Sequence, residues 1–347
     1  MAELRQSRFT SRDSERPVGS WQWIEHFVDE RFAPQPPLER VRMVGVPFGD
    51  VHIQAYATLN GVGDLRTMAF AQDDETKFQV AFGRKGGGQL VESAARAVLS
   101  YSTNSFGHFV AETLGSIIHH ARILRATECP RDLCFSVLTP SVQWFRFLQK
   151  LCPGICLSCM AEQSLLDREV IFERAMVFPT LSPWQNLVLA RNFLQRYLFM
   201  IPPDPQQPSR IYLFSPDQRR VLNQDVLQGW LNAHGFVTLD PCLIDPQELM
   251  LLLRDAALVI STQGSIALNL LLARTGPTIM LAWFSPLLTP RQFSGGGVFN
   301  AVAHGLWHEL PCRPVGLTKQ AIRHPYSVPI EVPIGELDRL YTRLKFS

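Results

Sequence analysis

The chain has 347 residues, which is long for one ordinary core and suits two domains. Hydrophobic residues make up 46% of it and charged residues 18%, a balance typical of a soluble globular protein with large buried cores. A formal net charge of +2 gives no reason to expect a nucleic-acid partner.

The N-terminal segment, residues 1–18, is polar and rich in charge, and we expect it to be disordered or loosely attached. It lacks the apolar stretch of a signal peptide. The richest apolar run, ELMLLLRDAALVIS, is interrupted by Arg254 and Asp255, which argues against a membrane helix. The sequence therefore predicts a cytoplasmic protein, and peripheral contact with the inner face of a membrane is left open.

Seven cysteines in a cytoplasmic chain are expected to be reduced thiols. Three of them, Cys152, Cys156 and Cys159, lie close enough together to test for zinc. No second CxxC or HxxxH pair follows nearby to complete a tetrahedral site. We therefore expect free thiols and no metal, with a metal site as the minor alternative.

Residues 20–95 show the alternation of short β-strands, broken by the glycines of GRKGGG at 83–88. These glycines are not followed by the Lys-Ser/Thr pair of a phosphate-binding loop, so they predict a flexible hairpin tip.

From about residue 105 the pattern becomes α/β. Expected helices cover residues 107–126, 141–151 and 184–198, and expected strands cover 133–138 and 174–179. In the first helix, His108 and Glu112 lie one turn apart in an otherwise apolar run, so their side chains leave the same face. They are either a polar pair that bonds to itself and caps this lobe, or the start of an active site.

Four prolines between residues 200 and 210 predict a linker over 201–210, which separates a domain at 19–200 from one at 211–347. Beyond it, strands are expected at 210–214, 236–240, 257–261 and 278–281, and helices at 221–233, 245–256 and 265–274. This alternation predicts a parallel sheet covered on both faces, with a ligand cleft between the two domains.

The stretch ALVISTQGSIALNLLLARTGPTIML predicts a buried strand, a tight turn and a helix that begins near Ser265. The first amides of such a helix have no partner within it, and its dipole places partial positive charge there. Gly264 would let a ligand approach the backbone closely, which favours phosphate or pyrophosphate. Asn269 lies one turn further along the same face. The alternative is an ordinary turn that needs a glycine and a serine cap.

A second strand–loop–helix unit, SRIYLFSPDQRRVLNQD, carries Arg219 and Arg220 in its loop and Asn223 in the first turn of its helix. Guanidinium groups bind phosphate oxygens through paired hydrogen bonds, so these arginines are candidates to hold a diphosphate. The alternative is a solvated pair of surface arginines. Further along, His304 and His308 are candidates to line the cleft, with a loop of no functional role as the alternative.

Taken together, these segments resemble glycosyltransferase family 61, which includes capsular polysaccharide biosynthesis proteins and protein O-linked GlcNAc and xylosyl transferases. The resemblance spans roughly residues 100–310 and has three blocks in the same order. They are the GHF…E helix, the RIYL…RR…N block and LMLLLRDAALVISTQGSIALNLLLA, and the closing VFNAVAHGLWHELPCRPV also fits.

The resemblance implies an α/β, GT-B-like fold with two Rossmann-like lobes and a β-rich N-terminal extension. It implies an inverting transfer of sugar from a nucleotide-sugar, expected to be a UDP-sugar, to a hydroxyl acceptor, without a metal or other cofactor. The acceptor would be a carbohydrate or glycoconjugate in surface polysaccharide or glycoconjugate assembly. His108 or Glu112 would deprotonate the acceptor hydroxyl, and which of them does so is left open. The expected donor-binding residues are Arg219, Arg220, Asn223, Gln263, Gly264, Ser265 and Asn269.

The chain departs from the family pattern at several positions. Gln263 stands where the family has a histidine, Gln224 where it has a glutamate, and Pro216 where it has an arginine. A catalytically weakened relative that binds a nucleotide or carbohydrate is therefore the alternative function. A nicotinamide-dependent oxidoreductase is disfavoured because no GxGxxG follows a strand. The sequence leaves the sugar and the oligomeric state open.

Overall fold

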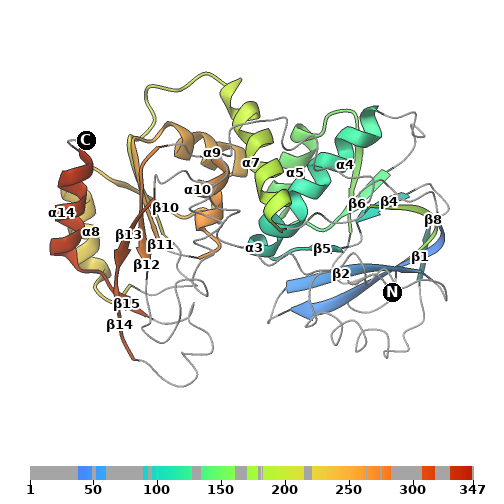
Figure 1. The fold of residues 1–347 in the computed structure, drawn as a ribbon, viewed down its shortest axis with the longest axis horizontal. Helices are drawn as coiled ribbons and strands as arrows, with labels where there is room; N and C mark the ends of the chain where they lie inside the picture. Colours follow the sequence, from blue (N-terminus) through green and yellow to red (C-terminus); the bar gives the residue numbers. More distant parts are fainter. Residues whose placement is uncertain are drawn as a thin grey trace, which may run out of the picture.

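The computed structural model describes residues 38–48, 52–59, 89–92, 96–99, 101–126, 134–160, 170–178, 181, 183–214, 221–262, 264–273, 276–282, 307–316 and 329–345. Within these residues the strands form one sheet of eight strands, one of five and a two-stranded ribbon. Figure 1 shows the two larger sheets at opposite sides of a central layer of helices. The N-terminal segment 1–18, the glycines at 83–88 and His304 lie outside the described residues.

The eight-stranded sheet is mixed. Its strands are β1 (Leu38–Phe48), β2 (His52–Leu59), β3 (Gln89–Glu92), β4 (Arg96–Leu99), β5 (Tyr101–Thr103), β6 (Cys134–Val137), β7 (Cys156–Cys159) and β8 (Val170–Phe178). The order is β5-β2-β1-β8-β4-β6-β7, and β3 pairs with β8. Strand β1 is antiparallel to β2 and β8, whereas β4, β6, β7 and β8 run parallel. The β pattern expected before residue 95 is thus confirmed for β1, β2 and β3, and these strands join the same sheet as the α/β segment.

The helices that follow these strands are α3 (Phe106–His108), the π-helical turn η3 (Phe109–Thr113), α4 (Leu114–Ala126), α5 (Val142–Leu151) and α7 (Pro183–Phe199). The first three form one continuous helix, close to the expected 107–126. Helix α5 begins where the Ser141 side chain accepts a hydrogen bond from the Trp144 amide, which satisfies one of the unpaired amides of the first turn. Helix α7 also matches its expected position, so both of these helices are confirmed.

The five-stranded sheet is entirely parallel. It contains β9 (Arg210–Leu213), β10 (Val237–Leu239), β11 (Leu258–Thr262), β12 (Thr278–Ala282) and β13 (Trp307–Pro311), in the order β10-β9-β11-β12-β13. After β9 the chain adds β10 on one side of β9. It then crosses to the other side of β9, where it adds β11, β12 and β13 in succession. Open sheets of this kind bind ligands at such a reversal, outside the carboxyl ends of the strands. Here that position lies at the ends of β9 and β11.

Helices α8 (Gln224–Ala233), α9 (Pro246–Asp255), α10 (Ala267–Ala273) and α14 (Ile334–Lys345) cover the two faces of this sheet. Successive side chains of a strand point to opposite faces. Ile211 and Leu213 accordingly pack in the cluster that contains α9 and α10, while Tyr212 packs in the one that contains α8 and α14. Figure 1 shows α8 and α14 on the outer side and α9 and α10 on the side of the first sheet.

One hydrophobic cluster extends from the first sheet to the second. It joins Phe135 of β6, Leu194 of α7 and Leu270 of α10 to Ile211 of β9. Polar contacts reinforce this junction, because the Arg254 guanidinium at the end of α9 donates to the carbonyls of Leu198 and Ile201. Residues 201–209, where the proline-rich linker is expected, form no helix or strand. Among the described residues, no helix is long and apolar enough to cross a bilayer.

Two expected helix starts are wrong by two or three residues. Helix α8 begins at Gln224 instead of residue 221, because Val221 forms a bridge with Ile330 beside the sheet and the next residues close a turn. Helix α10 begins at Ala267 instead of Ser265, because the three residues before it are taken up by the turn after β11.

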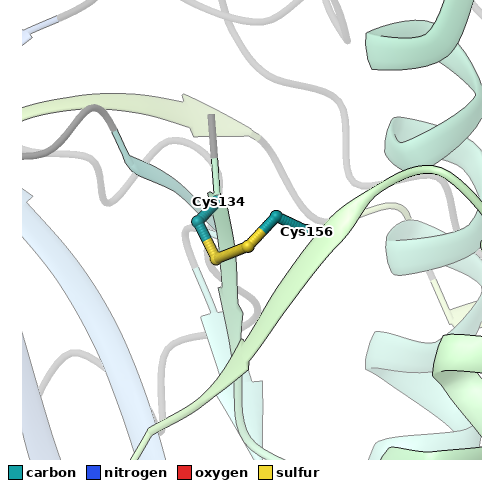
Figure 2. Close-up of a disulfide and its surroundings, with 2 residues drawn as sticks. All are labelled: Cys134 and Cys156. Carbon is teal, nitrogen blue, oxygen red and sulfur yellow. A yellow bond between two sulfur atoms is a disulfide. The ribbon is translucent and has the colours of Figure 1, made fainter. Parts of the chain in front are cut away.

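The expectation of reduced thiols is wrong for Cys134 and Cys156, which form a disulfide. Figure 2 shows their sulfur atoms bonded across the neighbouring strands β6 and β7. The two residues are direct register partners and their Cα atoms lie 4.6 Å apart, within the range that a disulfide can span. Four other described cysteines form no disulfide: Cys152, Cys159, Cys242 and Cys312. Burial raises the pKa of the Cys152 thiol to about 12, which keeps it unreactive.

Helix α4 carries two consecutive histidines, and the first makes stability depend on pH. Burial, aided by the charge of Arg122, lowers the pKa of His119 from 6.5 to about 4. Between these pH values the unfolded chain binds a proton that the folded chain does not. The free energy of unfolding should therefore be highest above about pH 6.5 and fall by about 2–3 kcal/mol as the pH drops to 4. Urea denaturation across this range should show the fall, and His119→Gln should remove most of it. An unchanged slope in the variant would contradict the assignment.

Candidate functional site

The helix at residues 106–126 changes its hydrogen-bond pattern at the residues that the sequence singles out. In η3 the Leu114 amide donates to the Phe109 carbonyl, five residues back instead of four. A π-helical turn of this kind is rare, and such turns occur frequently at functional sites. His108 is the last residue of α3, and Glu112 lies within η3. The widened turn therefore begins directly after His108 and contains Glu112.

His108 and Glu112 contact one another directly. The Nδ1 atom of His108 lies 2.8 Å from Oε1 of Glu112, and the side chains are 39% and 20% exposed. An ionised carboxylate can only accept a hydrogen bond, so Nδ1 carries the proton and Nε2 is the basic nitrogen of the ring. The two side chains thus bond to each other, as the interpretation of a polar pair requires. They are also exposed enough for a substrate hydroxyl to reach, as the interpretation of an active site requires.

The second motif forms a tight turn after β11. All five residues of β11 are buried, and the chain then bends at Gly264, whose φ of 143° is unfavourable for residues with a side chain. Gly264 and Ser265 are themselves partly exposed. The bend that the sequence predicts as an anion contact is therefore accessible from solvent.

More of the amides after this bend donate hydrogen bonds within the chain than the sequence predicts. The amides of Ala267, Leu268 and Asn269 donate to the carbonyls three residues before them, at distances of 3.0, 3.0 and 3.2 Å. These bonds are of the 3₁₀ type and tighten the entry into α10. The expectation of unpartnered amides at the start of the helix is therefore wrong for 267–269. A backbone contact to an anion would have to come from the residues before them.

Two of the side chains predicted to bind the donor, those of Asn223 and Asn269, form hydrogen bonds with the backbone instead. Asn269 is buried, and its Nδ2 donates to the Ile266 carbonyl at 3.2 Å, so it stabilises the turn. Asn223 bonds to Val332 twice, donating to its carbonyl at 2.8 Å and accepting from its amide at 2.9 Å. Both groups of the Asn223 amide are thus engaged with backbone beside α14. The remaining predicted donor residues, Arg219, Arg220 and Gln263, lie outside the described residues.

The structure brings the helix of His108 and the turn at Gly264 together at Gly107. A Cβ atom added at this glycine would lie 3.0 Å from Cβ of Ser265. The helix that carries His108 therefore packs closely against the turn that follows Gly264, and a side chain at position 107 would require Ser265 to shift. Figure 1 shows α3 at the edge of the first half of the molecule that faces α10. The candidate catalytic pair thus lies next to the candidate donor turn.

His308 lies away from this junction. It is the second residue of β13 and pairs with Ile279, the second residue of β12. Its pKa is lowered by burial and by the charge of Arg343 on α14. It therefore faces the α14 side of the sheet, opposite to α10, and the structure does not support its place in a cleft with His108. The described residues contain no group of three or more His, Cys, Asp or Glu side chains that could hold a metal ion.

Sequence reasoning missed two residues beside the site, Asn186 and Gly115. Asn186 of α7 is fully buried and bonds to the backbone on both sides of Glu112. A polar residue in an apolar helix is the only signal that its sequence context, PWQNLVLA, offers. Gly115, which allows α7 to come this close, is a second residue without an evident signal.

No curated protein matches this chain. The solved structures that resemble it weakly include the following two. One is the dodecameric iron-containing heptosyltransferase TibC in complex with ADP-D-beta-D-heptose, with 11% identity and a TM-score of 0.31, covering 73% of this chain and 75% of that one. The other is the bacterial iron-containing dodecameric glycosyltransferase TibC from enterotoxigenic E. coli H10407, with 10% identity and a TM-score of 0.33, covering 79% and 92%.

The family model for glycosyltransferase 61 matches residues 106–281, which are 176 of the 347 residues. The match begins at the helix of His108 and Glu112 and ends in β12, just beyond the turn at Gly264. It therefore contains the two segments that meet at Gly107 and Ser265. On this match the chain is a glycosyltransferase that belongs to glycosyltransferase family 61.

Proposed function

We propose that the protein is an inverting glycosyltransferase that moves a sugar from a UDP-sugar to a hydroxyl group of a carbohydrate or glycoconjugate. The observation that carries this proposal is the hydrogen-bonded pair His108–Glu112 beside the turn at Gly264 and Ser265. The first sheet and its helices would bind the acceptor, and the five-stranded sheet would bind the donor, in a GT-B-like arrangement. Assembly of surface polysaccharide or glycoconjugates would be its biological setting.

In this mechanism His108 is the general base and Glu112 orients it. Nε2 of His108 takes the proton of the acceptor hydroxyl while the hydroxyl oxygen attacks the anomeric carbon. The bond between that carbon and the diphosphate oxygen breaks on the opposite face, and its electron pair leaves with UDP. Glu112 holds the proton on Nδ1 and stabilises the imidazolium that forms, as a carboxylate does in other histidine-based sites. Attack from the face opposite the leaving group inverts the anomeric configuration.

Charge on the departing diphosphate must be offset by positive groups. Arg219 and Arg220 follow β9, and the Gly264 turn follows β11, which are adjacent strands of the sheet. The carboxyl ends of adjacent parallel strands lie at the same edge, so the sequence positions favour a shared diphosphate site there. Guanidinium groups would stabilise the leaving group most as the glycosidic bond breaks.

A panel of nucleotide sugars tests this function. The purified protein should release nucleotide from one of them faster in the presence of its acceptor than in its absence. NMR of the product should show an anomeric configuration opposite to that of the donor. Retention of configuration would rule out direct displacement with His108 as the base. A thermal shift with UDP but no transfer to any acceptor would instead support the binding-only alternative.

Arg220→Ala should weaken UDP binding by roughly 10–100-fold, because a hydrogen bond from a charged group to phosphate contributes about 1.5–3 kcal/mol. Isothermal titration with UDP measures this change, and thermal unfolding measures any effect on the fold. Arg313→Ala is a matched control, because Arg313 is largely exposed. Its ion pair with Glu331 is long, at 3.9 Å, and should contribute little to stability. Equal losses of binding and stability in Arg220→Ala would contradict a role in donor binding.

A further inference from the structure

The disulfide between Cys134 and Cys156 lies at the edge of the eight-stranded sheet. Each cysteine is the first residue of its strand, so the bond joins the amino ends of β6 and β7 (Figure 2). Among the described strands, β7 is the last in the sheet order and pairs with β6 alone. It has four residues, so few backbone hydrogen bonds hold it in place. The disulfide is therefore a covalent clamp on a short edge strand.

The two bonded cysteines differ in their access to solvent. Cys134 is only 7% exposed, whereas Cys156 is an exposed residue. Thiol–disulfide exchange begins when a thiolate attacks one of the two sulfur atoms, and it requires an open approach to that atom. A soluble thiol such as glutathione can therefore reach the sulfur of Cys156, while that of Cys134 is covered. Cys156 would form the new bond, and Cys134 would be the leaving thiol.

The nearby described thiols are placed so that they do not compete for this bond. Cys152 is buried, and burial raises the pKa of its thiol to about 12, so the reactive thiolate is rare near neutral pH. Cys159 follows Cys156 by three residues on β7, and an odd spacing along a strand places two side chains on opposite faces. The Sγ atom of Cys159 lies 3.8 Å from Oγ1 of Thr139 instead. Opening and reclosure should therefore involve the same two cysteines.

We propose that the Cys134–Cys156 disulfide is a redox-sensitive clamp, which a small thiol opens at Cys156 and which controls the pairing of β7 with β6. In the opening step a glutathione thiolate bonds to Sγ of Cys156, the bond to Cys134 breaks, and the Cys134 thiolate takes a proton from water. A second glutathione thiolate then attacks the glutathione sulfur of the mixed disulfide, which releases oxidised glutathione and leaves two thiols. Oxidised glutathione reverses both steps. None of these steps involves sugar transfer.

Hydrogen–deuterium exchange of the full chain, with and without dithiothreitol, tests the clamp. The amides of β7 should exchange about 10–100-fold faster in the reduced protein, because a cross-link between residues 22 apart restricts unfolding by up to about this order. Helix α9 packs beside the other sheet and is the internal reference, so its exchange should not change. Unchanged exchange in β7 would overturn the proposal. Faster exchange in α9 as well would show global unfolding and would overturn a local clamp.

Cys156→Ser removes the clamp without a reductant. Its β7 amides should exchange as fast as those of the reduced wild type, and dithiothreitol should change them no further. Cys159→Ser is the matched control, because it removes an exposed thiol from the same strand and keeps the disulfide. Its response to dithiothreitol should equal that of the wild type, and a lost response would contradict the assignment. If Cys156→Ser does not fold, the comparison of oxidised and reduced wild type decides alone.

Two single variants identify the reactive sulfur, because neither can close the disulfide. Cys134→Ser and Cys156→Ser are each incubated with oxidised glutathione, and mass spectrometry of digested peptides measures the rate of adduct formation. Cys156 in the first variant should acquire glutathione at least about tenfold faster than Cys134 in the second, because only Cys156 is exposed. Equal rates, or a faster reaction at Cys134, would overturn Cys156 as the point of attack. In wild type that has been reduced and reoxidised, a bond from Cys156 to any other cysteine would contradict reclosure of the same pair.

Discussion

His108→Ala is expected to lower kcat by about 10²–10⁴-fold, which is the usual contribution of a general base, with little change in the donor KM. The reason is that, in the proposed mechanism, His108 Nε2 takes the proton of the acceptor hydroxyl, whereas the donor would bind to the other sheet. Steady-state measurement of nucleotide release in the presence of acceptor gives both constants. Glu112→Ala should lower kcat less, and Glu112→Gln least, because a glutamine oxygen can still accept from Nδ1–H.

The double variant His108→Ala/Glu112→Ala separates a catalytic pair from two independent residues. If Glu112 acts only through His108, the double variant is no slower than His108→Ala alone. His234→Gln is a suitable control, because His234 and Asp338 form another histidine–carboxylate contact, at 3.5 Å, between α8 and α14. Its kcat should equal that of the wild type. Fully additive losses in the double variant would contradict the orienting role of Glu112.

Gly115→Ala is expected to lower the free energy of unfolding by roughly 3 kcal/mol or more, the upper end of the effect of overpacking a core. The new Cβ would lie 2.1 Å from the Asn186 carbonyl oxygen and 2.8 Å from its carbon. These are backbone atoms, so α4 and α7 would have to move apart. Denaturation with urea, monitored by circular dichroism, measures the change.

Gly229→Ala provides the comparison. Gly229 lies in α8, and a Cβ added there would meet no atom within 4 Å. Replacing a helical glycine by alanine without a steric conflict should raise stability by about 0.5–1 kcal/mol. Opposite signs in the two variants would show that close packing, and not helix propensity, determines the identity of residue 115. A Gly115→Ala protein as stable as the wild type would contradict the observed approach of α7.

Local chemistry was sufficient to predict most of the helices and strands. Ser141 and Asp245 cap α5 and α9, and the apolar run of β11 is buried throughout, so these elements follow from their own residues. The disulfide could not be predicted, because it depends on the register of β6 against β7. The start of α8 depends on Val221 pairing with Ile330, far along the chain.

The candidate site was predictable to a similar extent. The spacing of His108 and Glu112 placed them on one face, and the structure shows them in contact. The π-helical turn that contains Glu112 was not predictable, because the backbone around it bonds to Asn186, 70 residues after Ser116. Likewise, the approach of Gly107 to Ser265 is a tertiary contact between the two sheets' helices. Periodicity reports which face of a helix is buried but not what covers it.

The hydrophobic cluster that reaches from β6 to β9 has a consequence for motion. Domains that meet through small, polar surfaces are expected to move relative to one another. Here a separation would expose side chains such as Leu194 and Leu270 to water, at a cost of about 25 cal/mol for each Å². A wide hinge opening is therefore disfavoured, and we expect the histidine helix and the glycine turn to keep their alignment.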